Sequence, residues 1–183
     1  MSVITKQDHL VGDAPCPQEP VLPRLHPTTE IKMAIERENL RDDAILQSLA
    51  YLATESDWQG VWRIADALKR EVSLLFDDQG LIWVDVGDSG MVRLSPPNGS
   101  RLPLRLWVHT HPWDAYWSAT DQRTLATVTG ILEQALVLGH DHLVRTVHCA
   151  EMPTSSSASR LSNSGTLMHW TAEAKMPYRM EDC

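Results

Sequence analysis

Residues 104–121 read LRLWVHTHPWDAYWSATD. The apolar start, Leu104 to Val108, has the composition of a short buried strand, and side chains two positions apart on a strand point to the same face. We therefore expect His109 and His111 to lie on one face, where two imidazoles can share a metal ion. A carboxylate from the next element would complete a three-ligand set that leaves a fourth position for water.

The second half of this stretch predicts the start of a helix. Ser118 is a favourable N-cap residue, and a helix that begins there carries Asp121 in its first turn. A lone His-x-His pair is more often incidental than metal-binding, but the Ser-x-x-Asp sequence behind it strengthens the interpretation as a metal site.

The order His-x-His-Pro and then Ser-x-x-Asp resembles the signature of the JAMM, or MPN-plus (Mov34/JAB), zinc metalloproteases. In that family His-x-His ends a strand and Ser-x-x-Asp opens the following helix. Six residues separate His111 from Ser118 here, one fewer than is usual in the family. The resemblance implies that His109, His111 and Asp121 hold Zn²⁺. It also implies that Ser118 donates a hydrogen bond to the tetrahedral oxyanion.

The family also uses a glutamate at the join of a helix and the first core strand, and Glu71 matches this place. Upstream of it, apolar residues recur at helical spacing: Trp58, Val61, Trp62, Ala65 and Leu68. Downstream, 72–76 is an apolar strand. By resemblance, Glu71 would be the general base that takes a proton from metal-bound water. The alternative is a solvated carboxylate within a Lys-Arg-Glu cluster.

The pattern predicts a series of helices and strands around these residues. We expect a helix over Ser56–Arg70 that starts with a capping box of Ser56 and Gln59, and a second helix from Ser118 to Gly139. The second helix has an apolar stripe at Leu125, Val128, Leu132, Ala135 and Leu136. The expected strands are Val72–Phe76, Leu81–Val86, Met91–Leu94, Leu104–His109, Leu143–Cys149 and Leu167–Trp170.

The fold class that follows is α/β. The resemblance implies a single MPN-like domain over residues 56–183, with a curved mixed sheet flanked by helices in a cytidine-deaminase-like architecture. Residues 28–55 are expected to form an N-terminal helical extension with a break near Asn39. The proline-rich residues 1–27 are expected to form a flexible or draped tail.

Composition excludes several classes of protein. The chain has 183 residues with 16 basic and 24 acidic side chains and no long basic stripe, so we expect no nucleic-acid partner. Its three cysteines lack any Cys-x-x-Cys spacing, which argues against a disulfide framework and a cysteine-ligated zinc and favours the cytoplasm. No apolar stretch is long enough to cross a bilayer, so no membrane association is expected.

Other candidate residues have structural interpretations. The second His-x-His pair, His140 and His142, follows the expected helix end, where histidines can contact terminal carbonyls. Asp114 is expected to be a surface residue of the loop. Trp113 and Trp117 either line a substrate groove or pack the loop onto the core, and the sequence leaves both open.

The resemblance therefore predicts a zinc-dependent isopeptidase or peptidase of JAMM type, similar to a deubiquitinase. Its substrates would be bonds at the C-terminus of ubiquitin or ubiquitin-like proteins. Two alternatives remain: a catalytically inactive MPN-like scaffold that binds a partner, and a JAMM hydrolase with a non-ubiquitin substrate.

Overall fold

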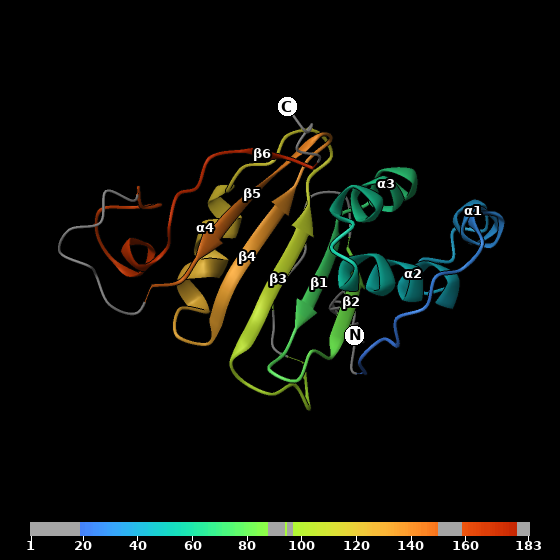
Figure 1. The fold of residues 1–183 in the computed structure, drawn as a ribbon, viewed down its shortest axis with the longest axis horizontal. Helices are drawn as coiled ribbons and strands as arrows, with labels where there is room; N and C mark the ends of the chain where they lie inside the picture. The colour runs from blue at the N-terminus through green and yellow to red at the C-terminus, as the bar shows by residue number, and fades with distance from the viewer. Residues whose placement is uncertain (1–18, 88–93, 95–96, 150–158, 179–183) are drawn as a thin grey trace, which may run out of the picture.

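The computed structural model describes residues 19–87, 94, 97–149 and 159–178. Three helices precede a sheet, and a fourth helix follows the third strand (Figure 1). The helices are α1 (Thr28–Glu36), α2 (Asp43–Thr54), α3 (Trp58–Leu68) and α4 (Ala119–Thr127). The strands are β1 (Val72–Phe76), β2 (Ile82–Val86), β3 (Leu104–Thr110), β4 (Leu132–Leu138), β5 (His142–Val147) and β6 (Met176–Pro177), and a short 3₁₀ helix, η1 (Thr166–His169), precedes β6.

The six strands form one mixed sheet in the order β2-β1-β3-β4-β5-β6. All neighbouring pairs are antiparallel except β3 and β4, which are parallel. Parallel neighbours require a crossover connection, and residues 111–131, which include α4, supply it. The α/β class with a mixed sheet flanked by helices is thus confirmed.

Helices cover both faces of this sheet (Figure 1). The cluster packed against α1, α2 and α3 includes Val108 of β3 and Leu136 of β4. The cluster packed against α4 includes Trp107 and Ala135, the neighbouring residues on the same two strands. The central strands are therefore buried on both sides, and the carboxyl end of β3 lies next to α4.

The expected helix from Ser118 to Gly139 is wrong in its second half. α4 ends at Thr127, and Leu132–Leu138 is a central strand. Gly130, with φ of +90°, adopts a left-handed conformation that side chains disfavour and lets the chain turn between the two. Ala135–Leu138 of β4 is buried on both faces and is an apolar run without strand alternation. Together with Leu132 it fits helical spacing by chance.

Gly139 consequently does not end a helix. It lies in the turn between β4 and β5, where the loop after β3 approaches it closely. A Cβ at this position would lie 2.6 Å from the backbone nitrogen of Ala115 and 3.0 Å from the carbonyl oxygen of Trp113. Glycine is needed here because two backbone segments pack against each other.

Three further expectations require correction or lie outside the described residues. Leu167–Trp170 is not a strand, because η1 occupies most of it, and the last strand is β6. The N-cap of α3 is Asp57 rather than Ser56, and the Asp57 carboxylate accepts from the backbone nitrogen of Gly60 at 2.9 Å. The expected strand Met91–Leu94 falls almost entirely outside the described residues.

Most other elements are confirmed, including the break near Asn39 between α1 and α2. The end of the proline-rich segment is draped over the fold. The backbone nitrogen of Val21 donates to the oxygen of Ile82 in β2 at 2.7 Å, and the ring of His26 contacts Gln47 of α2 at 3.0 Å. Residues 1–18 lie outside the description. Among the described helices, none has the length and apolar character to cross a membrane.

Candidate metal centre

The carboxyl end of β3 presents the two histidines. β3 lies between β1 and β4, and Ser73 of β1 is the partner of His109 in the register. His109 and His111 are 2% and 6% exposed. The indole of Trp107 stacks on the ring of His109 at 4.4 Å, as expected for side chains two positions apart on one strand face.

Neighbouring elements hold the end of β3 in place. The indole nitrogen of Trp62 in α3 donates to the carbonyl oxygen of His111 at 2.8 Å. The backbone nitrogen of His111 donates to Leu138 of β4 at 2.8 Å, and the hydroxyl oxygen of Thr110 accepts from the backbone nitrogen of Val72 at 3.0 Å. Three different elements thus hold the backbone that carries the two imidazoles.

The start of α4 supplies the carboxylate. Ser118 is the N-cap, as expected, and its hydroxyl oxygen accepts from the backbone nitrogen of Asp121 at 3.2 Å. Asp121 reciprocates: its Oδ2 accepts from the backbone nitrogen of Ser118 at 2.8 Å. This capping box fixes the Asp121 side chain on the side of the helix that faces β3.

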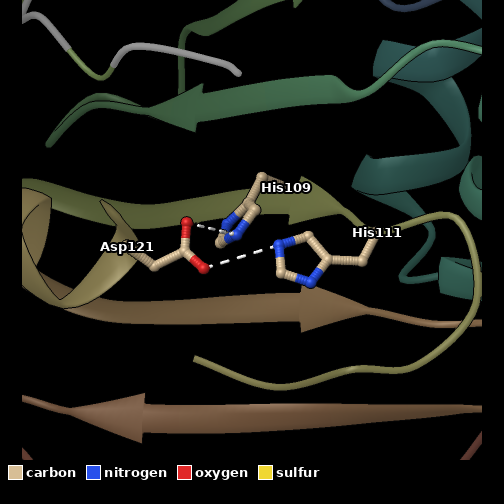
Figure 2. Close-up of side chains that lie close together, drawn as sticks. All are labelled: His109, His111 and Asp121. Carbon is tan, nitrogen blue, oxygen red and sulfur yellow. Dashed lines mark ion pairs between the residues drawn. The ribbon is translucent and has the colours of Figure 1, made fainter. Parts of the chain in front are cut away.

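The Asp121 carboxylate faces both imidazoles (Figure 2). Nε2 of His109 lies 3.1 Å from Oδ1, and Nε2 of His111 lies 3.4 Å from Oδ2. Ligand atoms of the three residues all lie within 4.8 Å of one another. The shorter loop between His111 and Ser118 therefore still brings Asp121 to the pair.

Burial and mutual contact control the ionisation of these groups. Burial lowers the pKa of His109 below its ordinary value, even though the Asp121 carboxylate opposes this effect. For Asp121, burial alone would raise the pKa, but contacts with His109 and His111 outweigh it and hold the pKa well below its usual range. Unprotonated imidazole and ionised carboxylate are the forms that bind metals.

The buried ring nitrogens test whether a metal fits this site. Within the described part of the chain, neither ring nitrogen of His109 nor Nδ1 of His111 has a well-aligned hydrogen bond, although Nε2 of His109 is close to Asp121. A buried polar group without a partner costs about 1–3 kcal/mol. The ring nitrogens that face Asp121 are the two Nε2 atoms, so a cation bound there would satisfy Nε2 of His109, whereas the Nδ1 atoms lie on the other side of the rings. His109, His111 and Asp121 can hold a metal ion.

The two other expected site residues line the same cavity as the ligands. This metal cavity, of about 390 Å³, is bordered by Glu71 and Ser118 together with all three ligands. Glu71 is half-buried, and burial raises its pKa, while His111 lowers it and Asp121 raises it further. Extending the register of β1 and β3 by two pairs beyond Ser73 and His109 places Glu71 opposite His111. The five residues that the sequence singled out thus lie at one site.

The two tryptophans of the loop differ. Trp113 is 79% exposed and lines the metal cavity together with Tyr116. Trp117 is partly buried against the core, with its ring 6.0 Å from that of His109. Of the two open interpretations, the groove lining suits Trp113 and packing suits Trp117.

Asp114 has a role that the sequence did not indicate. Its Oδ1 lies 2.7 Å from Nε2 of His142 and 2.5 Å from Nζ of Lys175, and it borders the metal cavity. These contacts attach the loop after β3 to β5 and to the chain before β6. No local sequence motif indicates these contacts, because the partners are distant in sequence.

Two further histidines, His148 and His169, lie together with their rings 6.0 Å apart, and they do not line the metal cavity.

Comparisons with protein-family models, curated proteins and solved structures find no match to this chain. The functional argument therefore rests on the site itself.

Proposed function

We propose that this protein is a zinc-dependent hydrolase of JAMM type, which cleaves peptide or isopeptide bonds at the C-terminus of ubiquitin or ubiquitin-like proteins. The observation that carries the proposal is the meeting of Glu71, Ser118 and the three-ligand group at one cavity. A structural histidine cluster would not require a half-buried carboxylate and a helix-capping hydroxyl beside it.

Zinc is the metal that we propose because two imidazoles and one carboxylate are a typical catalytic zinc set, with a further position available to solvent. When bound, zinc acidifies a coordinated water and polarises the substrate carbonyl. His109, His111 and Asp121 hold it. Their strand and helix anchors keep the three ligand atoms in place.

Glu71 takes a proton from the attacking water and returns it to the leaving amine. The pKa of this carboxyl is raised by burial, which strengthens it as a base. The backbone amide of Asp121 uses one lone pair of the Ser118 hydroxyl oxygen, so the hydroxyl proton remains available. Ser118 therefore donates that proton in a hydrogen bond to the developing oxyanion.

The ubiquitin-type substrate rests on the family resemblance alone. The cavity supports a hydrolase with a different peptide substrate equally well. A partner-binding scaffold is the second alternative. The buried Nε2 of His109 disfavours it, because this atom faces Asp121 without a well-aligned hydrogen bond and a metal ion would satisfy it.

A pair of carboxylate substitutions tests the mechanism. Glu71→Gln keeps the side-chain volume and all three ligands, so it should retain zinc and lower the rate of cleavage by about 100- to 10,000-fold. Asp85→Asn is the matched control, because Asp85 of β2 is also half-buried with a pKa raised by burial but does not border the metal cavity. Cleavage would be measured on a panel of ubiquitin-like fusions and isopeptide conjugates.

The outcomes separate the alternatives. Zinc-loaded protein that cleaves no conjugate or peptide on the panel would favour the scaffold. Cleavage of unrelated peptides alone would exclude the ubiquitin-type substrate but retain the hydrolase. Full activity in Glu71→Gln would show that another group is the base.

A further inference from the structure

A second cavity lies beside the metal cavity, between α3 and the end of β3. This α3 pocket encloses about 240 Å³. Its wall on the helix side is formed by Trp62 and Ala65, and its wall on the strand side by Thr110 and Pro112. The indole nitrogen of Trp62 is already bonded to the carbonyl oxygen of His111, so Trp62 has no further donor to offer a ligand. The pocket is predominantly apolar.

The α3 pocket and the metal cavity are neighbours that share part of their lining. Glu71, His111 and Pro112 border both of them. Ser118 and Asp121 border only the metal cavity. A group bound in the α3 pocket is therefore next to the proposed base and remote from the proposed oxyanion donor.

This placement identifies which half of a substrate enters the pocket. In the proposed reaction the carbonyl oxygen is directed at Ser118, and the leaving nitrogen receives its proton from Glu71. The residue attached to the leaving nitrogen lies on the Glu71 side. The α3 pocket is on that side, because Glu71 lines both cavities.

The volume and charge of the pocket limit its occupant. Pockets that enclose whole small-molecule ligands measure about 300–1,000 Å³, so 240 Å³ suits a single side chain. At the rim, Lys69 and Asp66 form an ion pair of 2.8 Å. Arg70 and Glu71 also line the pocket and carry opposite charges, so the lining has two basic and two acidic side chains and no net charge.

We propose that the α3 pocket binds a large apolar side chain, such as that of leucine, on the residue whose α-amino group is released by cleavage. An isopeptide-linked lysine fits less well, because its stem would have to pass through the pocket to reach the rest of the acceptor protein. The leaving-group assignment rests on the proposed function, whereas binding of an apolar side chain next to Glu71 does not.

Binding is tested first, without metal or catalysis. Protein labelled at its alanine methyl groups and stripped of metal is titrated with leucinamide, alaninamide and Nε-acetyl-lysinamide, and the Ala65 methyl is followed by NMR. Leucinamide should shift this signal saturably and with the highest affinity. No saturable shift, or tighter binding of the acetyl-lysine probe, would overturn the proposal.

A matched pair of variants then tests the location. Ala65→Leu fills the pocket, and Ala67→Leu places the same side chain on an exposed position of the same helix. Binding of leucinamide should be lost only in the first, and equal binding in both would overturn the proposal. Should Ala65→Leu fail to fold by circular dichroism, Ala65→Val replaces it, and the wild-type titration decides on its own.

The last test measures the rate of peptide cleavage. With matched peptides, wild-type kcat/KM should be on the order of 10- to 100-fold higher for leucine than for alanine after the cleaved bond. Ala65→Leu should abolish this preference, and Ala67→Leu should keep it. Equal rates for both peptides in the wild type would overturn the leaving-group assignment. If no peptide is cleaved while leucinamide binds, both the proposed function and the leaving-group assignment fail. The binding of an apolar side chain in the α3 pocket is then still supported.

Discussion

The chain contains two His-x-His pairs that lie in different structural environments. His109 and His111 end a central strand, are buried, and face a carboxylate from the next helix. His140 and His142 flank the turn before β5, where His140 is exposed and His142 is half-buried. Among the described residues, the group able to hold a metal contains the first pair and not the second. Identical spacing therefore has no fixed chemical meaning until the backbone is known.

The second pair supports the loop that carries the first. The backbone nitrogen of His140 donates to the oxygen of Trp113 at 2.8 Å, and the ring of His142 contacts both Asp114 and Asp141. These partners satisfy the ring nitrogens of His142, and the ring of His140 is open to solvent, so neither imidazole is among the buried groups without a partner in the described part of the chain. The first pair is arranged so that it can bind a ligand, and the second pair holds the loop after β3 in place.

The largest expected difference between the pairs is in metal content. His109→Ala and His111→Ala should each reduce bound zinc from about one ion per chain to almost none, because the two remaining ligands hold it poorly. His140→Ala and His142→Ala should retain it. Metal analysis after dialysis, with folding checked by circular dichroism, measures this. Equal zinc content in all four variants would contradict the assignment.

A second difference should be visible in the metal-free protein as pH changes. Burial lowers the pKa of His109 below its ordinary value of 6.5, so the unfolded chain binds a proton there before the folded protein does. This contribution to stability is intact above pH 6.5 and is lost as the pH falls toward the folded pKa. The free energy of unfolding should decrease by about 1.4 kcal/mol per pH unit in this range.

Urea denaturation at several pH values, in the presence of a chelator, measures this dependence. His109→Gln should flatten it because the titrating group is gone, whereas His140→Gln should leave it unchanged. A slope that is the same in His109→Gln and in the wild type would assign the pH dependence to other groups.

The smallest expected effect concerns the loop support. His142→Ala removes one contact of Asp114 but leaves its ion pair with Lys175. Zinc should still bind, with affinity reduced by less than the roughly 10- to 100-fold typical of losing a group bonded directly to a ligand. Competition with a chelator quantifies the change. A loss as large as that of His109→Ala would make the second pair part of the metal site.

The sequence predicted the elements whose ends are marked by turn or capping residues. The boundaries of β1 agree residue for residue, and α3 is found within two residues at each end. β4 was taken for a helix because its two buried faces remove the alternation that identifies a strand. Gly130 was the available signal for a break before Leu132.

The site residues were predictable because four of them lie in one short stretch, where strand and helix geometry set their directions. Glu71 needed the family resemblance, and the structure places it at the same cavity. The contacts of Asp114 with His142 and Lys175 were not predictable, since pairing across 28 and 61 residues depends on the sheet order.

The capping box of α4 has a consequence for how such a site would decay in evolution. Asp121 both faces the histidines and starts the helix, so a lineage that no longer needs the metal is still selected to keep it. The ring of His109 packs on Trp107, but its nitrogens have no such second role, because they lack well-aligned partners among the described residues. If the proposed metal centre were lost in a descendant, the histidines should therefore drift first, and the Ser-x-x-Asp sequence should persist.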